Sequence, residues 1–242
     1  MNTEIVVAYY HSLAFSEILS AFPKETTKII VYDKSNTGVY PTEEPTINFI
    51  KIIQNIWSRF FGDHSNSKSF QEIQTEFPNL ERIPRENRGR EGETYLSHII
   101  DRYDSLAEYT IFIQDDFDNH VPRYDYFIYN TNQMIQCKQA FYAYQCSWKK
   151  GGNPLLRTIE NGITDLGTFP SPDAILQTTM KFQIPLPILY QTDICAFFIV
   201  SRDRIRAKPI TFYRELREWL LADEANGFVL EHMWKLIFTS FS

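Results

Sequence analysis

The segment Asn87-Arg88-Gly89-Arg90-Glu91-Gly92 places two arginines and two glycines directly before an amphipathic, helix-like stretch. Glycine lets a backbone approach a ligand closely, and the first turn of a helix offers free N–H groups and the positive end of the helix dipole. Guanidinium groups bind phosphate oxygens in a bidentate manner. Together with Arg82 and Arg85, the segment therefore predicts a diphosphate site.

The same residues also fit a solvated charged loop. In that interpretation Glu86, Glu91 and Glu93 pair with the neighbouring arginines and no ligand is involved. The spacing matches neither the P-loop nor the dinucleotide-binding fingerprint. The residues alone leave both interpretations open.

An acidic turn, Gln114 to Asp118, follows the apolar run Tyr109–Ile113. Asp116 and Asp118 form an Asp-x-Asp pair, and Asp115 precedes it. Paired carboxylates at the end of a buried strand can hold Mg²⁺ or Mn²⁺, which then bridges the phosphates of a nucleotide. The turn predicts metal or sugar contact, with Asp116 and Asp118 as the metal ligands.

Two acidic residues are candidates for a general base. Asp193 lies between an irregular segment and an apolar strand, and Glu231 lies in an otherwise apolar last helix, where burial would raise the pKa of its carboxyl. Each can equally be a cap or a surface charge. His11 and His120 are candidate hydrogen-bond partners or ligands of the acidic-turn site, and His98 is expected to be a partly buried helix residue.

The elements that must position these groups begin with a strand at 5–9, a helix at 16–22 and a strand at 28–32. Strand, helix and strand within about thirty residues predict a parallel βαβ unit. Ligands of such sheets bind beyond the carboxyl ends of the strands. The residues at those ends are Tyr9, Tyr10, His11, Asp33 and Lys34.

Hydrophobic periodicity predicts the remaining elements. They are helices at 46–61, 93–103, 133–148, 209–221 and 228–238, and strands at 109–113 and 194–200. Residues 149–193 are rich in Gly, Pro, Asn and Thr, which predicts an irregular acceptor or lid segment. No repeat or linker divides the chain, so we expect a single α/β domain over residues 1–242.

Composition narrows the function class. The 242 residues are 43% hydrophobic and 22% charged, as in a globular protein, and the net charge of −6 argues against nonspecific nucleic-acid binding. Three cysteines without ligand spacing suggest reduced thiols. The start of the chain lacks signal-peptide features, and no stretch approaches the roughly 20 apolar residues of a membrane span. These features predict a cytoplasmic protein.

Several blocks of the chain resemble a widespread family long labelled as a domain of unknown function, found in fungi, bacteria and large DNA viruses of algae. The blocks are Asn87 to Ile100, Tyr103 to Gln114, Phe198 to Arg206, Pro209 to Tyr213 and Gly227 to Phe238. Members and their relatives look like nucleotide-sugar glycosyltransferases with a GT-A-like fold, including viral enzymes that build capsid-protein glycans. The chain departs from relatives at Tyr9–Ser12 and at Asp115, where relatives often carry glycine.

The resemblance implies a hexosyl- or pentosyltransferase with a GT-A-like, mostly parallel twisted sheet flanked by helices. A UDP- or GDP-linked sugar would be the donor, a glycan or glycoprotein the acceptor, and Mn²⁺ or Mg²⁺ a cofactor; a viral protein would act in the host cytoplasm. The alternatives are a noncatalytic carbohydrate- or nucleotide-binding module and a metal-dependent hydrolase. The implied donor-binding residues are Tyr9, Tyr10, His11, Asp33, Lys34, Arg85, Arg88, Gly89, Arg90, Glu91, Tyr95, Gln114 and Asp115.

Overall fold

The computed structural model describes residues 2–12, 15–24, 27–35, 70–115, 121, 124–144, 156–160, 163–164, 172–187, 189–193 and 196–240. The predicted helix at 46–61 lies outside the described residues, as do Asp116, Asp118 and His120.

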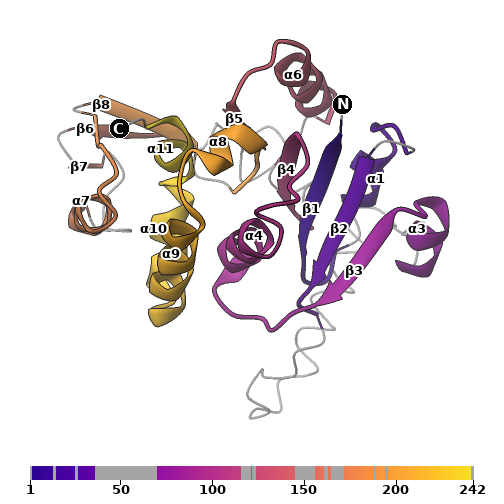
Figure 1. Ribbon diagram of the computed structural model, residues 1–242, viewed down its shortest axis with the longest axis horizontal. Helices are drawn as coiled ribbons and strands as arrows, with labels where there is room; N and C mark the ends of the chain where they lie inside the picture. Colours follow the sequence, from indigo (N-terminus) through magenta and orange to yellow (C-terminus); the bar gives the residue numbers. More distant parts are fainter. Residues whose placement is uncertain are drawn as a thin grey trace, which may run out of the picture.

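A six-stranded sheet forms the centre of the molecule (Figure 1). Its order is β3 (Leu80–Pro84), β2 (Thr27–Asp33), β1 (Thr3–Tyr9), β4 (Tyr109–Gln114), β9 (Phe198–Ser201) and β5 (Phe141–Ala143). The first four strands are parallel, and β9 runs antiparallel to both β4 and β5. The predicted α/β class with a mostly parallel sheet is confirmed.

Alternation along the strands gives the sheet two apolar faces. In β1, Val6 and Ala8 join one core cluster and Ile5 and Val7 join the other. The first cluster packs against α4 (Arg90–Asp101), α9 (Ile210–Ala222), α10 (Ala225–Glu231) and α11 (Trp234–Thr239). The second packs against α1 (Phe15–Leu19), α3 (Phe70–Glu76) and α6 (Tyr124–Gln136). Figure 1 shows α4 and α9 on one side of the sheet and α3 on the other.

The segment predicted to be irregular, 149–193, contains regular structure, and that prediction was wrong for its described part. A second sheet has the order β7 (Ile163–Thr164), β6 (Leu156–Glu160) and β8 (Leu189–Asp193), all antiparallel. Helix α7 (Pro172–Lys181) follows β7 and contributes Ile175 to the first core cluster, which we call the main core. Short strands without strong alternation leave little periodic signal in a sequence.

Two further helix predictions were wrong in their bounds. The helix expected at 133–148 is α6, which ends at Gln136, because Lys138 takes a left-handed conformation (φ 51°) and the chain then enters β5. The helix expected at 228–238 divides into α10 and α11. His232 and Met233 donate to carbonyls three residues back, which tightens the turn between them.

Sequence patterns did not identify α3, β3 or α8 (Arg202–Arg206). The edge strand β3 buries only Leu80 fully and alternates it with charged residues. The other two elements have only seven and five residues, too few for a helical period to stand out.

A polar network inside the main core joins β1, α4 and β2. Glu4 Oε1 lies 3.1 Å from His98 Nε2 and accepts a hydrogen bond from Thr110 Oγ1 at 2.8 Å. The Tyr32 hydroxyl lies 3.2 Å from His98 Nδ1. His98 is fully buried rather than partly buried as expected. Burial by itself would raise the pKa of Glu4, but the contacts with His98, Thr110 and the Ala107 N–H outweigh it and lower that pKa.

The lowered pKa of Glu4 makes stability depend on pH. The stabilisation is fully present above the ordinary glutamate value of 4.5 and is lost as pH falls through the lower value of the folded protein. We expect Glu4→Gln to cost about 2 kcal/mol at pH 7 and to flatten the acid limb of stability below pH ~4.5. Urea unfolding between pH 3 and 7 measures both. Glu215→Gln, at an exposed position on α9, is the control, and an acid limb identical to wild type in Glu4→Gln would contradict the assignment.

Among the described residues, no helix is both long enough and apolar enough to span a bilayer.

Candidate functional site

The carboxyl ends of the parallel strands lie level with one another. Tyr9 pairs with Asp33, Asp33 pairs with Pro84, and Ala8 pairs with Gln114. The chain runs outward from β1 through β2 to β3 and then returns to β4 on the other side of β1. The strand order therefore reverses between β1 and β4, which is where parallel α/β sheets place ligands.

Asp115 shapes the loop at this switch point. Its Oδ2 accepts hydrogen bonds from the backbone N–H groups of Tyr10, His11 and Ser12 at 2.7, 2.6 and 2.8 Å. The residue as a whole is 3% exposed. Asp115 thus fixes the path of the chain after β1 from the end of β4.

The segment before α4 takes an unusual backbone conformation. Gly89 has φ 61° and Arg90 has φ 53°, two successive left-handed residues. A Cβ on Gly89 would lie 2.8 Å from the Cβ of Glu93, so the position requires glycine. Lys34 holds this turn from beneath, because its ammonium donates to the carbonyls of Arg88 (2.9 Å) and Arg90 (2.6 Å).

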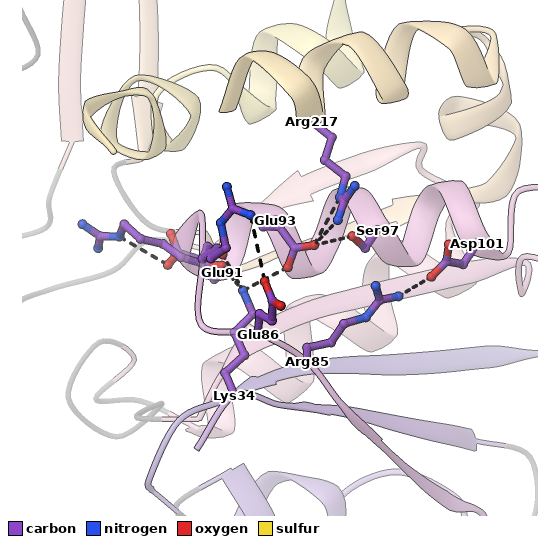
Figure 2. Close-up of polar contacts among 10 residues, drawn as sticks. Lys34, Arg85, Glu86, Glu91, Glu93, Ser97, Asp101 and Arg217 are labelled. Carbon is purple, nitrogen blue, oxygen red and sulfur yellow. Dashed lines mark hydrogen bonds and ion pairs between the residues drawn. The ribbon is translucent and has the colours of Figure 1, made fainter. Parts of the chain in front are cut away.

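Glu93 connects the turn to two cations. Its Oε2 lies 3.1 Å from Lys34 Nζ, and its Oε1 accepts hydrogen bonds from Ser97 (2.6 Å) and Arg217 (2.8 Å). Figure 2 shows Glu93 between Lys34 and Arg217, which reaches down from α9. Burial by itself would raise the pKa of Glu93, but the charge of Lys34 and these hydrogen bonds lower it, so the carboxylate stays ionised.

A pocket of about 280 Å³ opens beside this turn. Three arginines line it: Arg85 from the end of β3, Arg88 from the turn and Arg217 from α9, with Glu86 and Glu93 between them. Arg88 is 62% exposed and its contact with Glu86 is long, 3.9 Å. Arg85 pairs with the exposed Asp101 and Arg217 pairs with Glu93. A ligand phosphate would replace a long contact of Arg88 and an exposed contact of Arg85, whereas Arg217 would have to share its guanidinium with the buried Glu93.

A second cluster lies on the other side of the same helix start. Arg90 Nη2 contacts Glu231 Oε1 at 3.1 Å, its Nε lies 3.6 Å from Glu91 Oε2, and its guanidinium lies over the Phe228 ring at 4.1 Å. The buried hydroxyl of Tyr10 has no hydrogen-bond partner among the described residues. Burial and the carboxylates of Glu91 and Asp115 raise the pKa of Tyr10. The cluster joins the candidate base Glu231 to the predicted phosphate turn.

Other residues predicted for the nucleotide pocket lie apart from it. Tyr9 packs against Phe15 and Phe70 on the opposite face of the sheet from Tyr10. Asp33 is buried and pairs with Arg82, so that carboxylate faces β3. The remaining positions are a fully buried Tyr95 whose hydroxyl donates to the Ala196 carbonyl, an exposed His11, and Gln114 at the last position of β4.

The predicted metal ligands, Asp116 and Asp118, lie outside the described residues. In the part of the chain that the structure covers, no three His, Cys, Asp or Glu side chains are grouped so as to hold a metal ion. Asp115 does not offer Oδ2 as a ligand, because three N–H groups occupy it. Asp193, the other candidate base, ends β8 opposite Leu156 in the second sheet.

Sequence reasoning missed Arg217. The signal was its helical spacing: Arg217 follows the buried Tyr213 by four residues and precedes the buried Leu220 by three. It therefore lies on the inward face of α9, where an arginine must find a partner. A charged residue on the otherwise apolar face of a helix departs from the usual burial pattern and so indicates a binding or catalytic site.

Fold and site together define an α/β protein with an arginine-lined pocket at the carboxyl edge of a parallel sheet. The chain belongs to a family described as a protein of unknown function (DUF3431), whose model matches residues 67–242. No curated protein matches the sequence. Among solved structures, the crystal structure of S. aureus TarS 1-349 in complex with UDP is similar at 12% identity and a TM-score of 0.46. The similarity covers 96% of this chain and 55% of that one, so the chain spans about half the length of that structure.

Proposed function

We propose that this protein transfers a sugar from a nucleoside diphosphate sugar to a hydroxyl of a glycan acceptor. The observation that supports the proposal is the pocket lined by Arg85, Arg88 and Arg217 at the carboxyl edge of the sheet. Three guanidinium groups beside the start of a helix suit the charge and geometry of a diphosphate. The sequence blocks that resemble glycosyltransferases include the turn that forms this pocket.

In this proposal the arginines stabilise the leaving group. The bond between the anomeric carbon and the phosphate oxygen breaks, and Arg88 and Arg217 stabilise the negative charge that develops on the diphosphate. The acceptor oxygen forms the new bond to the anomeric carbon on the opposite face, which inverts the configuration. Its proton passes to a carboxylate that acts as general base.

Glu231 is our first candidate for that base, and Asp193 is the second. Glu231 lies on the other side of the same helix start as the arginine pocket, and its carboxylate contacts the Arg90 guanidinium at 3.1 Å. In this proposal an acceptor hydroxyl would lie beside that carboxylate and transfer its proton to it. Tyr10, beside this cluster, is a candidate contact for the sugar or the acceptor.

Binding of the donor tests the proposal first. We expect UDP or GDP, and their sugars, to raise the melting temperature of the protein at ligand concentrations well above Kd. Repeating the panel with Mn²⁺ and with Mg²⁺ tests the proposed role of Asp116 and Asp118 as metal ligands. Binding without release of the nucleoside diphosphate, across a panel of glycan acceptors, would favour a noncatalytic binding module instead.

Substitution of Arg88 localises the binding. Arg88→Gln removes an exposed guanidinium, so the melting temperature without ligand should stay within about 1 °C of wild type. Nucleoside diphosphate affinity should fall about tenfold, because one charge-assisted contact to phosphate is lost. Arg214→Gln, exposed on α9, is the matched control. Equal affinities in Arg88→Gln and wild type, measured by calorimetry, would exclude the pocket as the diphosphate site.

A further inference from the structure

A larger pocket lies at the opposite, amino edge of the parallel strands. Its volume is about 430 Å³, and it is lined where β4 begins, β9 ends and α6 turns toward β5. Three cations line it, Lys138, Arg202 and Arg204, together with the carboxylates of Glu108 and Asp203. None of these residues belongs to the arginine pocket beside α4.

The walls of this amino-edge pocket are held together by backbone hydrogen bonds. Ser201 N–H donates to the Ala140 carbonyl and Arg202 N–H donates to the Glu108 carbonyl, both at 2.9 Å. Ser201 Oγ accepts from Arg204 N–H at 3.3 Å and caps α8. These bonds join the β9–α8 corner to the start of β4 and to the β5 segment. The backbone that carries Arg202 and Arg204 is therefore held in place on both sides.

Two of the three cations in the pocket have no ion-pair partner in the described residues. Most arginines described above contact a carboxylate, including Arg82, Arg90 and Arg217. Neither Lys138 nor Arg202 has an ion-pair partner anywhere in the described part of the chain. Burial also lowers the pKa of Arg204, because its guanidinium has lost part of its water. An anion would supply a countercharge for Lys138 and Arg202.

Lys138 occupies a position that suits glycine better. Lys138 N–H donates to Ile135 O and Gln139 N–H donates to Met134 O, the bond pattern that ends a helix with a left-handed residue. Lys138 is that residue, with φ 51°. A side chain there costs local stability that glycine would not. A lysine at this left-handed position is explained if its ammonium binds a ligand in the pocket.

A second helix provides a matched comparison. Gln183 ends α7 in the same way, with φ 51° and hydrogen bonds from Gln183 N–H to Met180 O and from Ile184 N–H to Thr179 O. Gln183 does not line the amino-edge pocket. The two positions therefore share their backbone strain and differ in their relation to the pocket.

We infer that the amino-edge pocket binds a sugar phosphate, at a site separate from the one proposed for the donor nucleotide. Lys138, Arg202 and Arg204 hold the phosphate monoester, as cations do at phosphate sites. Glu108 and Asp203 accept hydrogen bonds from the sugar hydroxyls, which an inorganic phosphate lacks. The pair of carboxylates also disfavours a larger polyanion, since like charges repel.

Three probes test the inference by calorimetry: glucose 6-phosphate, inorganic phosphate and glucose. We expect glucose 6-phosphate to bind at least tenfold more tightly than inorganic phosphate, and glucose alone to bind no more tightly than phosphate. Equal affinity for the sugar phosphate and for phosphate would overturn the role of Glu108 and Asp203. Absence of binding by both anions would overturn the site itself.

Lys138→Gly separates a binding role from a structural one. The melting temperature should rise by about 2–4 °C, because backbone strain is relieved, while affinity for glucose 6-phosphate falls about tenfold. Gln183→Gly should raise the melting temperature similarly and leave that affinity unchanged. Arg202→Gln should weaken sugar phosphate binding without stabilising the fold. Unchanged affinity in both Lys138→Gly and Arg202→Gln would place any bound anion elsewhere.

The two proposed sites can fail independently. Arg88→Gln should weaken nucleoside diphosphate binding and leave glucose 6-phosphate binding unchanged, and Arg202→Gln should do the reverse. Parallel loss of both ligands in Arg202→Gln, with an unchanged melting temperature, would mean that one site binds both and would overturn the separate amino-edge site.

Discussion

Replacing Lys34 with methionine is expected to lower the free energy of unfolding by about 3–5 kcal/mol, although the two side chains have similar volumes. The Lys34 side chain is completely buried, and its ammonium contacts two carbonyls and the Glu93 carboxylate. Burial lowers the pKa of Lys34, and Glu93 opposes that shift. Without the ammonium, Arg217 is the one charged partner that Glu93 keeps within the described part of the chain. Urea unfolding at pH 7 measures the loss.

Two further variants show whether the loss comes from the buried charge. Lys24→Met removes an exposed lysine that pairs with Glu76 at 3.2 Å, and it should cost less than about 1 kcal/mol. Glu93→Gln in the Lys34→Met background should recover part of the stability, because the uncompensated carboxylate is gone. If Lys34→Met cost no more than Lys24→Met, the ammonium would not be what holds the turn before α4.

Replacing Asp115 with alanine is expected to cost about 3 kcal/mol and to loosen the loop after β1. One oxygen of this carboxylate accepts three backbone hydrogen bonds of 2.6–2.8 Å, and charge-assisted bonds of this kind are stronger than neutral ones. Leaving these partly buried N–H groups without their acceptor adds to the cost. Hydrogen exchange at Tyr10, His11 and Ser12 should accelerate in the variant, which locates the effect at the switch point of the sheet.

Asp115→Asn and Asp223→Ala complete the comparison. Asparagine keeps an acceptor oxygen but not the charge, so its cost should fall between those of wild type and Asp115→Ala. Asp223 accepts a single exposed N–H, from Ala225 at 2.9 Å, and its replacement should cost about 1 kcal/mol. Slow exchange at Tyr10 to Ser12 in Asp115→Ala, equal to wild type, would show that the loop does not depend on this carboxylate.

The parallel half of the fold could be predicted from the sequence because its strands are continuous apolar runs. The strands expected at 5–9, 28–32 and 109–113 are β1, β2 and β4, and the helix expected at 93–103 is α4. Strands buried on both faces need apolar residues at every position, and such runs are visible without knowledge of their neighbours. The carboxyl-edge location of Asp33, Lys34 and Asp115 followed from the same pattern.

Other features depended on contacts that a sequence does not reveal. Lys34 was expected to line a pocket, and its ammonium instead binds carbonyls from a turn more than fifty residues away. Tyr9 and Tyr10 are adjacent in the chain, yet alternation along β1 sends them to opposite faces of the sheet. Arg217 contacts Glu93, although the two residues are 124 positions apart in the sequence. Long-range pairing decides each of these cases.

Helix α4 has no solvent-facing side along most of its length. All nine residues from Glu91 to Ile99 are buried, including two glutamates, a threonine, a serine and a histidine. An amphipathic surface helix accepts many substitutions on its outer face, but this stretch has no outer face, and nearly every replacement would meet either packed atoms or an unmatched charge. The segment with the clearest sequence pattern is thus also the one that tolerates the fewest substitutions. Its characteristic sequence therefore reflects the packing of the protein interior as much as contact with any ligand.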